Sequence, residues 1–309
     1  MRPGAHGDPG GTTLLGIISR KQATVILVTG TTGYTGRFLL PRLAAWGQPL
    51  RCLVRPTSDQ TLLAPWPVEI CTGDLENPSS LGPALAGVRL IFHLAHIRYT
   101  PALIACAPAG LERLVLVSSQ RRYSRVPSPS VAEVIAGEQS ALNSALPWTL
   151  LRPTMIYGPG EDRNLNRLAA YLRRRRWIPV CGDGRALQQP LHVGDLVEAL
   201  LAAARAPAAL RRCYDLAGPE ALSYNALIDQ VGTALGLKAR KVHLPLSLVL
   251  AGLWLARKTG LVPDLEAEQF RRLQEDKHCA IDAARADLGF APRSLAAGLA
   301  QIYDIGKTI

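Results

Sequence analysis

Residues Thr24 to Gly36 have the sequence TVILVTGTTGYTG, and this stretch decides the fold. Five apolar or β-branched residues come first, three glycines follow, and apolar residues then recur at helical spacing from Phe38 to Leu43. The pattern predicts a buried strand, a glycine turn and a helix. Gly30 suits the tight bend, Gly33 lets a pyrophosphate come close, and Gly36 lets the helix pack on the strand. Because N–H groups at the helix N-terminus would face that anion, we expect a dinucleotide site.

The composition is that of an ordinary globular protein, with 48% hydrophobic and 19% charged residues among 309. The longest apolar segment, Leu244 to Ala256, is shorter than the about 18 residues of a membrane span. Residues 1–22 are rich in glycine and proline and lack a secretory pattern, so we expect a disordered tail. The six cysteines are far apart and form no C-x-x-C pair, which indicates a reduced, cytoplasmic protein without a zinc site.

Positive charge is the main departure from an average composition, with a net charge of +11. Arginine runs occur at 121–122, 173–176 and 271–272. Arginine greatly outnumbers lysine throughout the chain, and no aromatic stacking pattern or DNA-reading motif accompanies the runs. We therefore expect no nucleic acid as a partner. Attraction to phosphorylated metabolites or to an anionic membrane surface is the better explanation of the charge.

Further strand patterns alternate with helical segments, which predicts a parallel sheet with helices on both faces. The expected strands are 49–54, 68–71, 88–94, 111–118 and 149–152. Ligands of such sheets bind at the carboxyl ends of the strands. Five residues fall at such ends and are expected to line the dinucleotide site: Gly30, Arg55, Asp74, Ala95 and Ser118.

The end of the second strand bears on which cofactor is used. An acidic residue there accepts from the 2′-hydroxyl of NAD, whereas an arginine accommodates the 2′-phosphate of NADP. Here the strand ends at Arg55, no acidic residue precedes Asp59, and Arg37 follows the last glycine of the turn. We therefore expect NADP(H) to be preferred over NAD(H). The alternative is that both arginines only lie on a solvated surface.

Two histidines, His93 and His96, lie near the end of the fourth expected strand. A metal pair would be conceivable at this spacing, but no third ligand with suitable spacing accompanies it, and protein zinc sites use about three or four ligands. We therefore expect histidines that are satisfied in the core or face solvent, and no metal.

The last third of the chain predicts a second, smaller domain that is mostly helical, with helices at 224–235, 247–257, 263–274 and 294–302. We expect a dinucleotide-binding domain at 23–176, to which 190–218 returns, and a small substrate domain made of 177–189 and 219–309. Within it, five apolar residues share a helical face just before Arg257 and Lys258: Leu246, Val249, Leu250, Leu253 and Trp254. Such a stripe usually packs in a core. The alternative is peripheral contact with a membrane.

Several motifs occur in a fixed order along the chain: TGTTGYTG, Gly73-Asp74-Leu75, FHLAH, VLVSS, LRPTMIYGPG, LHVGDL and IDAARADLGFAPRS. Together they resemble the extended short-chain dehydrogenase/reductase family, the NAD-dependent epimerase/dehydratase group, over residues 25–297. The resemblance implies an α/β fold: a Rossmann-like, doubly wound parallel sheet with a small, mostly helical C-terminal substrate domain. It implies that Asp74 contacts adenine and that the segment from Arg152 to Thr154 borders the nicotinamide. The expected cofactor contacts are Gly30, Thr32, Gly33, Tyr34, Gly36, Arg37, Arg55, Asp74, Leu75, Ala95, Ser118 and Pro153.

The sequence departs from the family at the catalytic centre. Relatives carry a Tyr-x-x-x-Lys pair, in which the lysine lowers the pKa of the tyrosine. Alignment on Glu138 places Ser130 and Val134 at these two positions, and the chain has no lysine from residue 22 to 237. Ser119 matches the serine or threonine that orients the substrate in relatives. Tyr123 is a candidate proton donor; the alternative is a loop tyrosine that contacts substrate or solvent.

Two hypotheses about function follow from this atypical site. The first is an NADP(H)-dependent oxidoreductase or sugar-nucleotide epimerase-like enzyme with a small, phosphorylated or glycosyl substrate. The substrate contacts expected are Tyr157, Arg163, Asn164 and Arg185, although these loop residues would also suit a solvated surface. The second hypothesis is a non-catalytic NADP(H)-binding sensor, assembly or scaffold protein, because both catalytic partners are missing.

Overall fold

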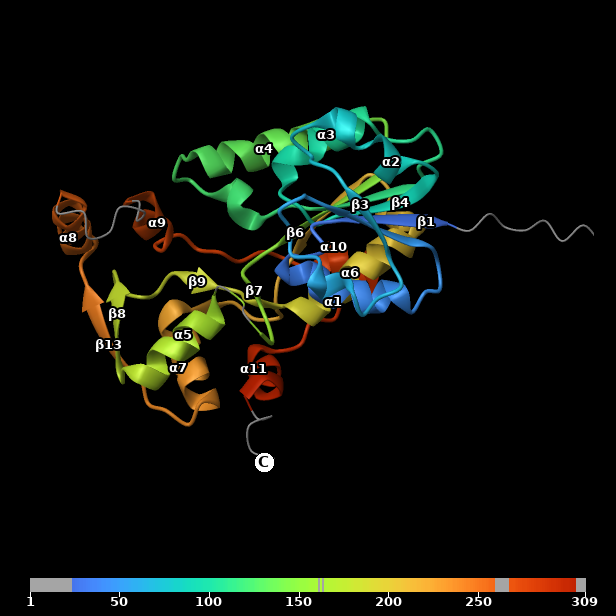
Figure 1. Cartoon of the computed structure of the whole chain (residues 1–309). Coiled ribbons are helices and arrows are strands. Elements are labelled where there is room, and N and C mark those ends of the chain that lie inside the picture. Colours follow the sequence, from blue (N-terminus) through green and yellow to red (C-terminus); the bar gives the residue numbers. More distant parts are fainter. Residues whose placement is uncertain (1–23, 161, 163, 259–266, 304–309) are drawn as a thin grey trace, which may run out of the picture.

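Seven parallel strands form the main sheet, in the order β11-β6-β5-β4-β1-β2-β3 (Figure 1). The computed structural model describes residues 24–160, 162, 164–258 and 267–303. The strands are β1 (Val25–Thr29), β2 (Leu50–Val54), β3 (Glu69–Thr72), β4 (Val88–His93), β5 (Arg113–Val117), β6 (Trp148–Pro153) and β11 (Arg212–Leu216). All neighbouring pairs run parallel, so their carboxyl ends share one edge of the sheet. This confirms the predicted Rossmann-like sheet.

The strand order reverses between β1 and β4. Thr29 of β1 pairs in register with His93 of β4, so the glycine turn after β1 begins beside the residues that follow β4. In doubly wound sheets, ligands bind in the crevice at such a switch point. The topology therefore positions the predicted dinucleotide site between these two strand ends.

Helices cover both faces of the main sheet (Figure 1). One face carries α1 (Tyr34–Ala44), α6 (Val193–Arg205) and α10 (Asp282–Leu288), whose apolar residues form one core with the strands. The other face carries α2 (Gly82–Leu85), α3 (Thr100–Ala105) and α4 (Pro129–Leu142) over a second core. Short 3₁₀ helices lie between these elements: η1 (Thr61–Leu63), η2 (Pro78–Ser80), η3 (Ile97–Tyr99), η4 (Gln120–Tyr123) and η5 (Pro207–Ala209).

A third core lies outside the main sheet, among α5 (Leu165–Arg174), α7 (Tyr224–Ala234) and α11 (Leu295–Tyr303). Three two-stranded sheets accompany it: β7 (Ile156–Tyr157) with β10 (Leu191–His192), β9 (Leu187–Gln188) with β12 (Leu222–Ser223), and β8 (Trp177–Cys181) with β13 (Arg240–Leu244). Two further helices, α8 (Leu246–Lys258) and α9 (Ala267–Arg272), complete this part. No helix in the described ranges is long and apolar enough to cross a bilayer.

The cores differ from the expected domain boundaries at two places. The helix α5, expected in the larger domain, packs in the third core, whereas α10, expected in the smaller one, packs on the main sheet. The chain thus crosses between the two parts more often than the boundaries at 176, 190 and 218 allow. The predicted tail at 1–22 and the start of the helix expected at 263–274 lie outside the described residues.

The start of α6 shows how a distant contact overrides a local pattern. Its N-cap is His192, whose Nδ1 accepts from the backbone N–H of Gly194 at 3.0 Å. Asp195, which suits a cap by residue type, lies inside the first turn. Its carboxylate instead accepts from the Arg293 guanidinium, with Nη2 at 2.8 Å and Nε at 2.9 Å. This ion pair links the segment before α11 to α6.

Candidate functional site

The glycine turn after β1 has the backbone geometry that its sequence predicts. Gly30 has a positive φ of 72°, and a Cβ on it would lie 2.8 Å from the backbone N of Ala95. A Cβ on Gly36 would lie 2.6 Å from the carbonyl O of Gly30 and would also collide with the backbone of Thr31. A Cβ on Gly33 would lie 3.1 Å from the same Gly30 oxygen. Each of the three positions therefore restricts side chains through backbone atoms that cannot easily move.

The N-terminus of α1 fits an anion such as a pyrophosphate. Its N-cap, Gly33, offers no capping side chain, and no acidic residue lies in the first turn. The first N–H groups of a helix have no partner within the helix, and the helix dipole is positive at this end. With no carboxylate in the first turn of the helix, these donors suit a phosphate at the carboxyl edge of β1. The residues of this turn therefore fit a dinucleotide.

Tyr34 joins this turn to the loop after β7. Its hydroxyl donates to the carbonyl O of Pro159 at 3.1 Å. Burial, followed by the nearby Asp162 carboxylate, raises the pKa of Tyr34, so the hydroxyl keeps its proton. Asp162 is itself buried and accepts from the backbone N–H groups of Gly158 and Asn164. The two loops are thus held together beside the predicted pyrophosphate position.

The other predicted cofactor residues lie along the same sheet edge but differ in exposure. Arg55 after β2 and Arg37 on α1 are both exposed, and no ion pair within the described ranges involves either one. Asp74 follows β3, and its Oδ1 accepts from the backbone N–H of Glu76 at 2.9 Å. Leu75 and Pro153 are buried. The contacts of these residues with a cofactor stay predictions.

A buried ionic network occupies the carboxyl ends of β5 and β6. Glu138 of α4 is fully buried and accepts from Arg152 through Nε at 3.0 Å and Nη2 at 2.9 Å. It also accepts from Ser118 Oγ at 2.5 Å and pairs with Arg122 of η4. Because the Ser118 hydroxyl donates its proton to Glu138, its Oγ could contact a cofactor only as a hydrogen-bond acceptor.

Tyr123 extends this network towards solvent. Its hydroxyl accepts from Arg152 Nη1 at 3.2 Å and faces the Asp215 carboxylate of β11, with Oδ2 at 3.3 Å. Asp215 also accepts from Gln120 Nε2 at 2.7 Å. The ring is 51% exposed, so the hydroxyl lies at the open end of a buried charge network. Burial, followed by the Asp215 carboxylate, raises the pKa of Tyr123.

The remaining catalytic candidates lie on η4 and α4. Ser119 is half-buried, and its Oγ accepts from the backbone N–H of Arg121 at 3.1 Å, which caps η4. On α4, Ser130 is half-buried, with its Oγ 3.1 Å from that of Ser128, and Val134 is buried in the core. Neither Ser130 nor Val134 carries a phenol or an ammonium group.

The segment after α9 lies against η4 and brings further cations to the same region. Glu275 accepts from Ser124 Oγ at 2.7 Å and from the backbone N–H of Arg125 at 2.6 Å. Arg272 pairs with Glu268 at 3.2 Å. Burial, followed by Arg272, lowers the pKa of Lys277, and Arg121 of η4 also contributes. Sequence reasoning missed Lys277 because a single lysine in a polar run carries no local signal.

Of the four residues expected to contact the substrate, the three that the structure describes lie in different environments. Tyr157 is fully buried in the third core, edge-on to His192 with ring centroids 5.3 Å apart, so its place in a substrate cleft is corrected. Asn164 Nδ2 donates to the carbonyl O of Ile156 at 2.9 Å. Arg185 is exposed and lies 3.8 Å from Asp183, as a solvated loop residue would. Arg163 lies outside the described residues.

His93 has a structural environment. It is fully buried on β4, and its Nδ1 lies 2.8 Å from Thr29 Oγ1. Burial lowers the pKa of His93 to about 4, so the ring is neutral near pH 7. Within the described residues, no group of three His, Cys, Asp or Glu side chains could hold a metal ion.

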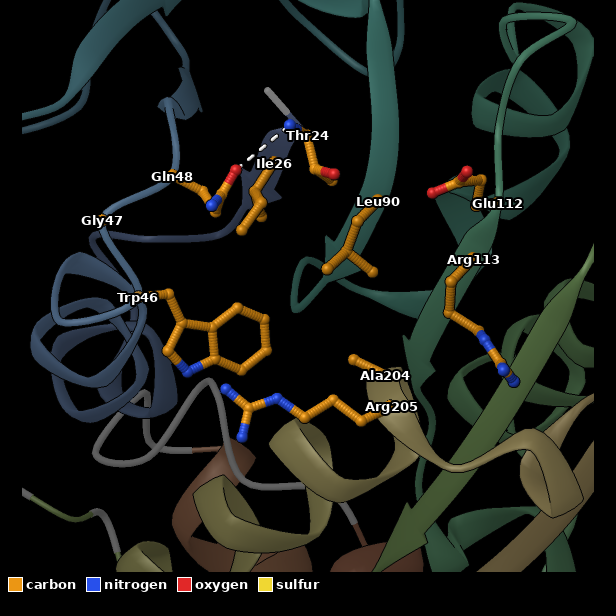
Figure 2. Close-up of a pocket in the computed structure, with 10 residues that line it drawn as sticks. All are labelled: Thr24, Ile26, Trp46, Gly47, Gln48, Leu90, Glu112, Arg113, Ala204 and Arg205. Atoms are coloured by element: carbon orange, nitrogen blue, oxygen red, sulfur yellow. Dashed lines mark hydrogen bonds between the residues drawn. The ribbon is translucent and has the colours of Figure 1, made fainter. Parts of the chain in front are cut away.

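Two cavities lie away from the carboxyl edge. Figure 2 shows one of about 580 Å³ at the amino ends of β1 and β4, opposite the glycine turn, where the Arg205 guanidinium lies 3.9 Å from the Trp46 ring centroid. Its lining is Thr24, Ile26, Trp46, Gly47, Gln48, Leu90, Glu112, Arg113, Ala204 and Arg205. The other, of about 530 Å³, lies among α5, α7 and α11. Because ligands of doubly wound sheets bind at the carboxyl ends, we do not assign the cofactor to either cavity.

The fold and the glycine turn define an NAD(P)-binding, Rossmann-like protein, and residues 30–170 match the NAD(P)H-binding family model. The chain is 31% identical to the ceramide reductase of Caulobacter vibrioides over 239 residues, which cover 72% of this chain and 74% of that protein. The chain belongs to the extended short-chain dehydrogenase/reductase family.

Two further similarities bear on fold and length. A mitochondrial relative from Arabidopsis thaliana, NADH dehydrogenase [ubiquinone] 1 alpha subcomplex subunit 9, is 25% identical over 260 residues. The match covers 75% of this chain but only 63% of the relative's length. The crystal structure of DesIV, a dTDP-glucose 4,6-dehydratase from Streptomyces venezuelae, has a TM-score of 0.72 at 20% identity, covering 92% of this chain and 97% of that one. This last likeness supports the fold alone.

Proposed function

We propose that this chain is an NADP(H)-dependent oxidoreductase that reduces a small carbonyl compound, with Tyr123 as the proton donor. The observation that carries the proposal is the Tyr123 hydroxyl, held between Arg152 and Asp215 at the carboxyl edge of the sheet. The glycine turn, Arg37 and Arg55 would hold the cofactor, which supplies a hydride when bound. Similarity to a protein named as a ceramide reductase supports the same class of reaction.

The network around Tyr123 suits the transfer of one proton. The Tyr123 O–H bond breaks and a new O–H bond forms on the carbonyl oxygen, which becomes the alcohol. The phenolate left behind would face the Arg152 guanidinium 3.2 Å away, which would offset part of the repulsion from the Asp215 carboxylate. Solvent returns the proton, because about half of the Tyr123 surface is exposed. Ser119, at the start of η4, would orient the carbonyl group.

The direction of the pKa shift favours reduction over reactions that begin with a base. Burial and the Asp215 carboxylate raise the pKa of Tyr123, so the hydroxyl stays protonated near neutral pH. A protonated tyrosine is a poor base, but it can still give its proton to an oxygen that would otherwise become the more basic alkoxide. Oxidation of an alcohol, or an epimerisation that starts with such an oxidation, needs a base at this point. A reductase therefore fits this hydroxyl better than an epimerase.

Replacing the proposed donor, in Tyr123→Phe, is expected to lower kcat roughly 100-fold, the scale of general acid catalysis. The affinity for NADPH is expected to stay unchanged, because Tyr123 lies near the ends of β6 and β11, away from the glycine turn that would hold the pyrophosphate. The assay is NADPH consumption with a panel of aldehydes and ketones, some of them phosphorylated. Tyr99→Phe is the matched control, since that hydroxyl contacts Glu76 outside the network. Unchanged turnover in Tyr123→Phe would remove the proposed role.

Substituting Arg55→Asp is expected to reverse the choice of cofactor. The arginine would no longer accommodate the 2′-phosphate of NADP, and the carboxylate would accept from the 2′-hydroxyl of NAD. We expect NADPH affinity to fall at least roughly tenfold, the cost of about one charge-assisted hydrogen bond, and NADH affinity to hold or rise. Isothermal titration with both dinucleotides measures the two. Equal losses for both would show that Arg55 does not read the 2′ position.

The substrate itself is proposed to carry a negatively charged group such as a phosphate. Arg121, Arg272 and Lys277 gather where the segment after α9 lies on η4, close in sequence to Ser119 and Tyr123. The Glu268 and Glu275 carboxylates neutralise part of the positive charge of these three residues. Lys277, however, is largely buried and forms no ion pair within the described ranges. An anionic group of the substrate would complete the balance.

A second function is favoured by one observation on α4. Val134 is buried in the core and Ser130 bonds to its neighbour, so the positions of the usual catalytic pair are committed to packing. The chain would then bind NADP(H) without turnover and serve as a sensor, assembly or scaffold protein, and the similarity to a subunit of NADH dehydrogenase supports this. Tight NADPH binding with no turnover across the carbonyl panel would favour this second function over the first.

A further inference from the structure

Exposed apolar side chains gather at the outer end of the smaller part of the molecule. Of the large apolar side chains that are exposed in the described residues, most lie on or beside β8, β13, α8 and α9: Trp177, Val242, Leu248, Trp254, Leu255 and Leu273. The others are scattered singly over the main sheet and its helices. Scattered exposed residues need no explanation, but a gathered set marks an interaction surface. Figure 1 shows α8 and the β8–β13 pair at the end of the molecule away from the main sheet.

The helix α8 is apolar on two sides, and only one of them is covered. Most of the stripe expected from the sequence faces inward, with Leu253 only 7% exposed against the elements around it. The outer side carries Leu248 and Leu255, which are 63% and 59% exposed, with Ala251 and Gly252 exposed between them. These four positions follow the i, i+3, i+4, i+7 spacing of one helix face. The exposed stripe is therefore continuous along the helix.

The β8–β13 pair continues this surface. Its parallel register places Trp177 beside Arg240 and Pro179 beside Val242, so the four residues share one face of the pair. All four are exposed. The chain passes from the end of β13 through Pro245 directly into α8. The exposed face of the strand pair and the exposed stripe of α8 are therefore joined by a single residue of the chain.

The border of this surface is strongly basic. The run from Arg173 to Arg176 ends α5 and leads into Trp177, and all four arginines are exposed. The backbone N–H of Arg240 donates to the carbonyl O of Arg176 at 2.8 Å, which brings a further arginine and the exposed Lys238 alongside. Asp229 forms an ion pair with Lys241. No ion pair within the described ranges involves Arg174, Arg175, Arg176 or Arg240, so their charges are not neutralised by a neighbouring carboxylate.

We propose that α8 and the β8–β13 pair dock on the surface of an anionic lipid bilayer. Leu248, Leu255 and Trp177 enter the headgroup boundary, and the arginine run faces the lipid phosphates. An apolar face with an aromatic residue and a basic border is the pattern of interfacial membrane binding. The positive charge of the arginine run favours an anionic lipid surface, because a neutral protein partner would offer these arginines no counter-charge. The 13 residues of α8 lie along the interface and do not cross it.

Flotation of the full chain with lipid vesicles tests the proposal. We expect binding to vesicles of phosphatidylglycerol mixed with phosphatidylcholine, at least tenfold weaker binding to phosphatidylcholine alone, and loss of binding at high salt. Leu248→Asp and Leu255→Asp are each expected to weaken binding at least tenfold. Replacing Arg175 or Arg176 by glutamine is expected to weaken it roughly fivefold each. The matched control is Ile135→Asp on α4, an equally apolar exposed site far from this surface, with binding unchanged.

Thermal unfolding of each variant shows that the protein still folds, and NADPH binding is measured in parallel because it does not depend on this surface. The proposal is overturned if the native chain ignores anionic vesicles, or if Leu255→Asp binds them as well as Ile135→Asp does. It is also overturned if light scattering without lipid shows a dimer that Leu255→Asp converts to a monomer. A second copy of the chain would then cover the surface.

Discussion

Replacing Arg152 by leucine is expected to lower the free energy of unfolding by about 3–5 kcal/mol, the usual cost of breaking a buried ion pair from one side. Glu138 is fully buried and receives three hydrogen bonds from Nε and Nη2 of this guanidinium. Arg122 remains as a partner in the variant, but its side chain is more exposed and it reaches only one carboxylate oxygen. The Glu138 carboxylate would thus lose most of the donors that offset its removal from water. Urea unfolding near pH 7 measures the change.

Two controls separate a buried charge from a general loss of packing. Arg42→Leu breaks an exposed pair with Glu198 and is expected to cost at most about 1 kcal/mol. The double variant Arg152→Leu, Glu138→Leu removes both charges and is expected to recover much of the loss, because no carboxylate is left buried. A loss for Arg152→Leu no larger than that for Arg42→Leu would mean that the network contributes little to stability.

Substituting Gly36→Ala is expected to weaken NADPH binding roughly 100-fold. The new Cβ would collide with the carbonyl oxygens of Gly30 and Thr31, so the turn or the helix start must move. Overpacking of this kind costs about 1–3 kcal/mol. A loss of about 1.4 kcal/mol in binding free energy lowers the affinity tenfold. Fluorescence titration with NADPH measures the loss.

The matched control for Gly36→Ala is Gly110→Ala, where an added Cβ meets no atom within 4 Å. That variant is expected to bind NADPH like the native chain. If Gly36→Ala binds NADPH equally well, the anion is not held at the start of α1, and the site proposed at the glycine turn is wrong.

The sequence predicts those parts of the fold that depend on neighbouring residues. The glycine turn is such a case, because Gly30, Gly33 and Gly36 are required by backbone atoms a few residues away, apart from the contact between Gly30 and Ala95. The main strands follow from short apolar runs for the same reason. The start of α6 does not, since Asp195 is drawn away from capping by Arg293, which lies 98 residues later. On α8 the sequence predicts the apolar stripe that packs inward, but only the packing shows that Leu248 and Leu255 stay exposed on the other side.

Of the candidate site, only the glycine turn that would bind the dinucleotide could be predicted from the sequence. The family resemblance indicates Ser119, and Tyr123 is a candidate because it lies close to Ser119 in sequence, but the sequence does not indicate the partners of Tyr123. Asp215 lies 92 residues beyond Tyr123 and reaches it because β11 pairs with β6. Tyr157 was misplaced for a related reason: a tyrosine after a strand end suits a cleft or a core, and here neighbouring helices close over it. Long-range pairing of this kind leaves no trace in local spacing.

The most direct test of the whole account is titration of the purified chain with NADPH, NADP, NADH and NAD, followed by fluorescence and thermal stability. We expect saturable binding of NADPH with a rise in melting temperature, and weaker binding of NADH. Absence of binding by all four dinucleotides would contradict it, because the glycine turn and the uncapped start of α1 would then serve only the fold.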